Sequence, residues 1–290
     1  MKVITQAFLW FNIFSLFCYS QISPVKITID RDGIILQGRF FASAENKGNH
    51  KPTVILLAGF PGGERDVLGI GEKLSEAGFN TLTFNYTGTY KSQGLASFEN
   101  QQKDIKAAFD FIRNPVNIDK YKIDTSRIYL GGWCHGGGMA LAYASKHPEV
   151  TSVFSVAGND FGEFLRLYKS NTQMKNIIDK MFDDLISKPE VARFEKGAMP
   201  FEMAEAGLEK MDTIFDIRKN ASLLAKKNIL LIGGWDDEQI KVDNFLLPLY
   251  RALQKSKAER VRIVTFQDDH YFKNTREDVA KAIIDWLKNL

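Results

Sequence analysis

The stretch RIYLGGWCHGGGMALAY, Arg127–Tyr143, decides the expected fold of this chain. Its first residues are β-branched and aromatic, as in a strand, and its last residues are small and helix-forming. Between them Cys134 lies in the frame G-x-C-x-G, flanked by Gly132 and Gly136. A tight strand-to-helix turn of this form lifts one side chain above a sheet, and its glycines leave room for the neighbouring strand and helix. The pattern therefore predicts a nucleophile elbow with Cys134 at its apex.

The composition is that of one large α/β domain. The chain has 290 residues, of which 44% are hydrophobic, and this is enough for a sizeable buried core. Its 38 Lys and Arg nearly balance its 35 Asp and Glu and are scattered, so we expect no nucleic-acid partner. No group of His, Cys and Asp has the spacing of metal ligands, so we expect neither a metal nor another cofactor.

The N-terminal residues have the form of a secretory signal peptide. Lys2 precedes the apolar run Ala7–Tyr19, and small residues lead to a break after Ser20. The run is shorter than the roughly 20 residues that a membrane-spanning helix needs. We therefore expect residues 1–20 to be a signal peptide and the mature protein to be secreted or periplasmic, with no stable membrane span after cleavage.

Removal of that segment changes the cysteine count. Cys18 is lost, and its lipidation is disfavoured because Phe17 is too bulky for the position before a lipidated cysteine. Cys134 is then the single thiol of residues 21–290 and cannot form an internal disulfide. A lone thiol is a hazard in an oxidising compartment, so its place at the elbow indicates that it is used.

Strand and helix patterns alternate along most of the chain, which predicts a mostly parallel sheet flanked by helices. The expected strands are 25–30 and 34–42 as a hairpin, then 53–58, 80–86, 127–130, 150–157, 228–232 and 261–266. The expected helices are 64–78, 97–113, 137–146, 242–255 and 275–290. From Phe161 to about Lys227 only helical patterns occur, among them Met174–Ile186 and Phe201–Leu208. We expect this part, about 161–227, to be a helical cap inserted into the domain of residues 21–290.

Two acidic loops follow later strands, at the edge where open α/β sheets place their sites. An elbow nucleophile of this kind is followed along the chain by an acid and then by a base. The loop GGWDDE offers Asp236 or Asp237 as the acid, and the loop QDDHYF offers His270 as the base. Asp160, which follows the preceding strand, is a further candidate for the acid.

These motifs resemble the α/β-hydrolase superfamily over nearly the whole mature chain, about Ile27–Leu290. GWCHGG is similar to the elbow of that family, and DDHYF is similar to its base loop, with His270 as the base. GGWDDEQI resembles its acid segment, which implies Asp237 as the acid and Ile240 at the apolar position. The resemblance implies an α/β-hydrolase fold with a Cys134, Asp237 and His270 triad.

The segment LAGFPGG resembles the oxyanion loop of the family. The resemblance implies that the backbone N–H groups of Phe60 and His135 bind the oxyanion. The chain departs from the family twice: Ala58 stands where histidine is usual, and Cys134 stands where serine is usual. Cysteine is the nucleophile of dienelactone hydrolases, which are members of the superfamily.

The chemistry expected of this triad is acyl chemistry on a small-molecule ester, acyl or peptide substrate. A thiolate at Cys134 would attack the carbonyl of a carboxylic ester, thioester, lactone or peptide, and the thioester would then be hydrolysed. Two alternatives stay open: acyl transfer through the same intermediate, and ligand binding under the cap without catalysis. We expect His50, His147 and the side chain of His135 to be incidental, and Gly88 and Gly94 to serve the backbone.

Overall fold

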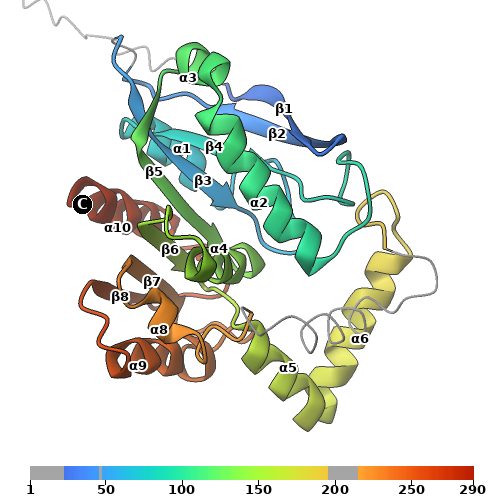
Figure 1. Ribbon diagram of the computed structural model, residues 1–290. Helices are drawn as coiled ribbons and strands as arrows, with labels where there is room; N and C mark the ends of the chain where they lie inside the picture. Colours follow the sequence, from blue (N-terminus) through green and yellow to red (C-terminus); the bar gives the residue numbers. More distant parts are fainter. Residues whose placement is uncertain (1–22, 46–47, 195–214) are drawn as a thin grey trace, which may run out of the picture.

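A single eight-stranded sheet organises the protein. The computed structural model describes residues 23–45, 48–194 and 215–290. The strands are β1 Val25–Arg31, β2 Ile34–Phe41, β3 Lys51–Leu57, β4 Asn80–Phe84, β5 Ile123–Trp133, β6 Ser152–Val156, β7 Asn228–Gly234 and β8 Val261–Phe266. Their order is β1-β2-β4-β3-β5-β6-β7-β8; β2 pairs antiparallel with β1 and β4, and the other pairs are parallel. The expected mostly parallel sheet is confirmed (Figure 1).

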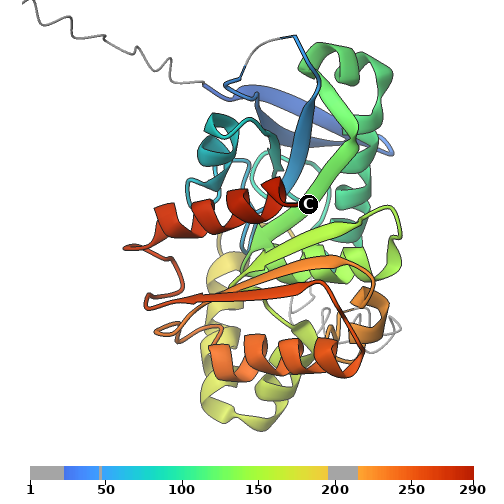
Figure 2. The ribbon, with the colours of Figure 1, turned by 90° about the vertical axis from the view of Figure 1, so that its left-hand side faces the viewer.

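Helices cover both faces of the sheet, because neighbouring residues of its buried strands point to opposite sides. They are α1 Ile70–Glu76, α2 Phe98–Arg113, α3 Pro115–Tyr121, α4 His135–Lys146, α8 Ala221–Leu224, α9 Leu247–Lys255 and α10 Arg276–Lys288, with the π-helical turn η1 Val242–Leu246. In β3, Val54 and Leu56 join the core under α1 and α10. Ile55 and Leu57 join the core under α2 and α4. Figure 2 views the molecule from the α10 side.

Some helix boundaries differ from the expected ones for local reasons. The helix expected from residue 64 begins only at Ile70, because Leu68 and Gly69 adopt left-handed backbone with φ of 56° and 80°. The carboxylate of Asp66 accepts hydrogen bonds from the N–H groups of Gly71 and Glu72, which lie in the first turn of α1. Helix α3 was not expected, since its seven residues are too few to show a clear period.

The expected insertion follows β6 and returns to β7. It begins with the helices α5 Phe161–Ser170 and α6 Thr172–Ile186, which lie beyond the carboxyl ends of the strands (Figure 1). The helix expected at Phe201–Leu208 and the expected signal peptide, residues 1–20, lie outside the described residues. In the described part of the chain, no helix has the length and apolarity needed to cross a membrane.

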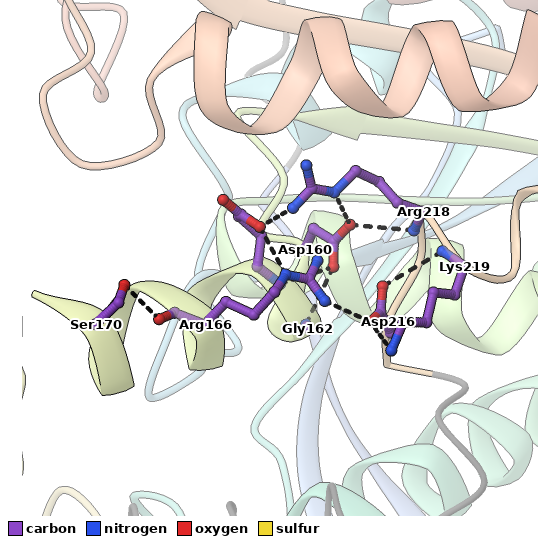
Figure 3. Close-up of polar contacts among 8 residues, drawn as sticks. Asp160, Gly162, Arg166, Ser170, Asp216, Arg218 and Lys219 are labelled. Atoms are coloured by element: carbon purple, nitrogen blue, oxygen red, sulfur yellow. Dashed lines mark hydrogen bonds and ion pairs between the residues drawn. The ribbon is translucent and has the colours of Figure 1, made fainter.

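Charged side chains tie the two ends of the insertion together (Figure 3). Asp160, directly before α5, lies 3.3 Å from Nε of Arg218 and accepts a hydrogen bond from the backbone N–H of Arg218. Nη1 of Arg166, on α5, lies 2.7 Å from Oδ2 of Asp216. Arg218 also pairs with Glu163. These ion pairs fasten the start of α5 to the chain that leads back to the sheet.

Candidate active site

Cys134 occupies a strained turn between β5 and α4. Its backbone has φ 55° and ψ −120°, a region that costs a residue other than glycine on the order of 1–3 kcal/mol. The turn needs glycine on both sides: a Cβ on Gly132 would lie 2.5 Å from the carbonyl carbon of Gly136, and a Cβ on Gly136 would lie 2.3 Å from the carbonyl oxygen of Leu57. Cys134 itself is half-buried.

The structure brings Cys134, His270 and Asp237 together at the carboxyl edge of the sheet. Nδ1 of His270 lies 2.7 Å from Oδ2 of Asp237, and both side chains are buried. The side chain of Cys134 lies close enough to His270 to raise the pKa of its imidazole. Since Nδ1 faces the carboxylate, Nε2 is the ring nitrogen left to exchange a proton with the thiol.

The surroundings of His270 favour its charged form. Burial, the largest single influence, lowers the pKa of the imidazole. The hydrogen bonds and charges of Asp237 and Cys134 outweigh burial and raise the pKa of His270 to about 9. An imidazolium beside the sulfur stabilises the thiolate, which is the nucleophilic form of cysteine. The first turn of α4, which begins directly after Cys134, adds partial positive charge on the same side.

The other two candidates for the acid point elsewhere. The carboxylate of Asp236 accepts a hydrogen bond of 2.7 Å from Nε2 of Gln267. Asp160 caps α5 by accepting from the N–H groups of Gly162 and Glu163, and Figure 3 shows it facing the insertion. Burial and, after it, the nearby charge of Asp216 raise the pKa of Asp160 to about 6.

The loop after β3 lies beside the turn at Cys134. Gly59 approaches the nucleophile so closely that a Cβ on it would lie 3.3 Å from Cβ of Cys134. The next residue, Phe60, and the first residue of α4, His135, therefore both lie beside the turn. Within residues 23–45, 48–194 and 215–290, the backbone N–H groups of Phe60 and His135 have no hydrogen-bond acceptor. They are free to bind a substrate oxygen.

The side chain of His135 has a structural role that the sequence did not reveal. Its Nε2 lies 2.8 Å from Oε1 of Gln101 on α2, and rings surround it within about 6 Å of its own, from Phe60, Tyr86, Phe98 and Phe161. Burial lowers the pKa of His135 to about 3, so the ring is neutral. This packing holds in place the residue that directly follows Cys134. A buried histidine needs a polar partner, but only the fold shows that Gln101 is that partner.

The remaining histidines and glycines singled out in the sequence lie apart from the triad. His147 pairs with Glu149 at 2.9 Å and stacks on Tyr143, and His50 is exposed. Gly88 and Gly94 both have left-handed backbone, with φ of 78° and 83°, in the loop that follows β4. Among the described residues no group of His, Cys, Asp and Glu could hold a metal ion.

Comparisons with known proteins agree with the fold. A protein family described as "alpha/beta hydrolase fold" matches residues 52–195. Cutinase 2 of Thermobifida cellulosilytica is 27% identical over 114 residues, which are 39% of this chain and 41% of the cutinase. A cutinase of Thermobifida fusca, cut1, is 27% identical over 114 residues, 39% of this chain and 34% of its own length. The chain thus matches less than half the length of either cutinase.

Solved structures extend the likeness to almost the whole chain. Est1E from Butyrivibrio proteoclasticus superposes with a TM-score of 0.65 at 17% identity, covering 91% of this chain and 98% of Est1E. An esterase of Pyrococcus furiosus superposes with a TM-score of 0.67 at 16% identity, covering 92% of this chain and 91% of the esterase. At this level of identity the likeness is one of fold.

Proposed function

The chain belongs to the α/β-hydrolase superfamily, and on that premise we propose that it is a hydrolase with Cys134 as its nucleophile. The substrate is a carboxylic ester or a related acyl compound: a thioester, a lactone or a peptide. The observation that carries the proposal is the alignment of Cys134 at a strained turn with His270 and Asp237. Carboxylic esters are favoured within this set because the similar proteins are named cutinases and esterases.

In the first half of the reaction Cys134 is acylated. The thiolate sulfur forms a bond to the carbonyl carbon, and the π electron pair of the carbonyl moves onto its oxygen. The N–H groups of Phe60 and His135 bind that oxyanion, and loss of one such donor typically costs about 100- to 1000-fold in rate. When the carbonyl re-forms, the leaving alkoxide departs and takes the proton from Nε2 of His270.

In the second half of the reaction, water hydrolyses the thioester at Cys134. Acylation removes the charge of Cys134, one of the influences that raise the pKa of His270. The now neutral imidazole takes a proton from water, and the hydroxide attacks the thioester carbonyl. The thiolate of Cys134 leaves, the carboxylic acid is released, and Asp237 stabilises the imidazolium at each step. An alcohol or amine in place of water would give acyl transfer through the same intermediate.

We further propose that the protein acts outside the cytoplasm. This rests on the signal-peptide pattern of residues 1–20 and on the single thiol that remains after Cys18 is removed. The cap, about 161–227, shapes the substrate site in this proposal. Its described part already reaches the oxyanion loop, because the ring of Phe182 on α6 packs edge-on against Phe60 with centroids 5.6 Å apart.

The experiment that tests the function compares four variants of the mature protein with the parent. p-Nitrophenyl esters and aryl thioesters of short acids are the substrates, and the variants are Cys134→Ala, Cys134→Ser, His270→Ala and His147→Ala. We expect turnover by the parent and by His147→Ala, and losses of at least about 100-fold in the other three. Iodoacetamide should label Cys134 in the parent, as read by peptide mass spectrometry.

Other outcomes have distinct meanings. If iodoacetamide leaves Cys134 unmodified and no variant differs from the parent, the nucleophile is elsewhere. If Cys134 is labelled but no acyl substrate is turned over, the protein binds ligands without catalysis. If an added alcohol shifts the product from the free acid to a new ester, the protein is an acyltransferase.

A further inference from the structure

Trp133, the residue before the nucleophile, contacts the loop that carries the base. Its Nε1–H donates a hydrogen bond of 3.0 Å to the backbone carbonyl oxygen of His270. Its ring lies 5.1 Å from the imidazole of His270, at an angle of 43°, and 5.5 Å from the ring of Tyr271. One side chain thus contacts both the backbone and the ring of the base.

The opposite edge of the indole rests on the oxyanion loop. A Cβ on Gly59 would lie 2.7 Å from Cζ3 and 2.8 Å from Cε3 of Trp133. Glycine at position 59 therefore leaves the room that the indole occupies. The residue after Gly59 is Phe60, one of the two proposed oxyanion donors. Trp133 therefore bridges the loop that binds the oxyanion and the loop that supplies the base, on either side of Cys134.

We propose that Trp133 is a positioning residue for His270. Its N–H fixes the carbonyl of the base, and its ring fixes the tilt of the imidazole, so that Nδ1 faces Asp237 while Nε2 faces Cys134. The proposal rests on the proposed function, because only a catalytic His270 needs this orientation. A displacement of a catalytic imidazole by about 1 Å can lower the reaction rate on the order of 100-fold.

A purely structural role for Trp133 makes a different prediction. A half-buried indole that only fills space would affect the free energy of unfolding and leave the chemistry of His270 unchanged. A positioning residue would instead lower kcat with little change in KM. It would also lower the pKa of His270, because a mobile ring spends less time in contact with Asp237 and Cys134, the two groups that raise that pKa.

The test uses two variants: one loses both the N–H donor and the indole shape, and the other loses only the N–H donor. Trp133→Phe removes both, and benzothienylalanine at position 133 keeps nearly the shape of indole but has no N–H. Trp286→Phe is the matched control, because Trp286 is a buried residue of α10 in the core on the far side of the sheet from α4. The readouts are kcat and KM for p-nitrophenyl acetate and the pKa of His270, measured by NMR of histidine-labelled protein.

We expect kcat to fall about tenfold or more in both position-133 variants, with KM within about twofold of the parent. The pKa of His270 should fall from about 9 toward its ordinary value near 6.5. Trp286→Phe should keep the parent's kcat and His270 pKa.

The proposal is overturned if the variants at position 133 fold and keep both the kcat and the His270 pKa of the parent. If Trp133→Phe does not fold, the benzothienylalanine protein decides, because its ring preserves the packing. If the parent hydrolyses no ester, the proposed function fails on its own. The NMR titration of His270 still tests whether Trp133 holds the imidazole.

Discussion

Oδ2 of Asp237 lies 2.7 Å from Nδ1 of His270, and the other oxygen of the same carboxylate is itself held in place. Oδ1 accepts hydrogen bonds of 2.8 Å and 2.7 Å from the backbone N–H groups of Gln239 and Ile240. The carboxylate therefore cannot rotate away from the imidazole without losing two hydrogen bonds, one buried and one partly buried. This arrangement fixes which ring nitrogen of His270 faces Cys134.

Asp237→Asn should lower kcat about 100- to 10,000-fold while the fold is retained. The amide no longer enforces the tautomer that has a proton on Nδ1, and it does not stabilise the imidazolium. Steady-state kinetics on a p-nitrophenyl ester and circular dichroism of both proteins check this expectation.

The matched control for that variant is Asp236→Asn, one residue away. The carboxylate of Asp236 accepts a hydrogen bond from Gln267 and, among the described residues, forms none with His270. The kcat of Asp236→Asn should therefore stay within about threefold of the parent. A larger loss of kcat in Asp236→Asn than in Asp237→Asn would show that Asp236, not Asp237, is the acid.

The stability of the folded protein should depend on pH through His270. The pKa of this group is about 9 in the folded state and near 6.5 when unfolded. Its contribution is therefore fully present below about pH 6.5 and is lost as pH rises toward 9. One pKa unit corresponds to about 1.4 kcal/mol, so the free energy of unfolding should fall by up to about 3 kcal/mol over that range.

Urea unfolding at several pH values, with His270→Asn beside the parent, measures this contribution. The variant should lack most of the decrease between pH 6.5 and 9, whereas His147→Asn, which changes a partly exposed histidine paired with Glu149, should retain it. Equal pH dependence in the parent and in His270→Asn would show that the imidazole has no stabilising partner.

Asp160→Ala should destabilise the protein by about 2 kcal/mol without abolishing alkylation of Cys134. It removes the two hydrogen bonds that cap α5 and one anionic partner of Arg218. Urea unfolding and the rate of iodoacetamide labelling are the two measurements. Asp110→Ala, an exposed partner of Lys106, should cost about 0.5 kcal/mol or less. Loss of labelling in a folded Asp160→Ala protein would show that Asp160 acts in the catalytic site.

Gly136→Ala should be among the most damaging single substitutions in the chain. Its methyl group would lie 2.3 Å from the carbonyl oxygen of Leu57 in β3, so the strand or the helix must move. We expect a loss of about 3 kcal/mol or more in the free energy of unfolding, or no folded protein. Gly63→Ala, where an added Cβ meets nothing within 4 Å, should change it by less than about 1 kcal/mol.

Much of the fold and the order of the site residues could be predicted because both depend on local patterns. Buried parallel strands are nearly continuous apolar runs, and the loops after β7 and β8 must end at the same edge as the turn at Cys134. The choice of Asp237 over Asp236 could not be settled by pattern. Neighbouring residues of one loop point in different directions, and only the backbone decides which carboxylate faces His270.

Contacts between distant segments could not be predicted from the sequence, for a different reason. The hydrogen bond from Trp133 to His270 joins residues 137 positions apart, and the bond between Gln101 and His135 joins two separate elements. No period or motif encodes such pairs. They follow from the twist of the sheet and from the packing of α2 on α4, which become definite only when the whole core is assembled.

The most direct test of the central claim is to trap the acyl-enzyme. The parent is mixed with p-nitrophenyl butyrate, quenched in acid within milliseconds to seconds, and examined by intact and peptide mass spectrometry. We predict one butyryl group on the peptide that contains Cys134, released by neutral hydroxylamine as a thioester is, and absent from Cys134→Ala. Turnover by the parent with no acyl group on Cys134, or with the acyl group on another residue, would contradict the account.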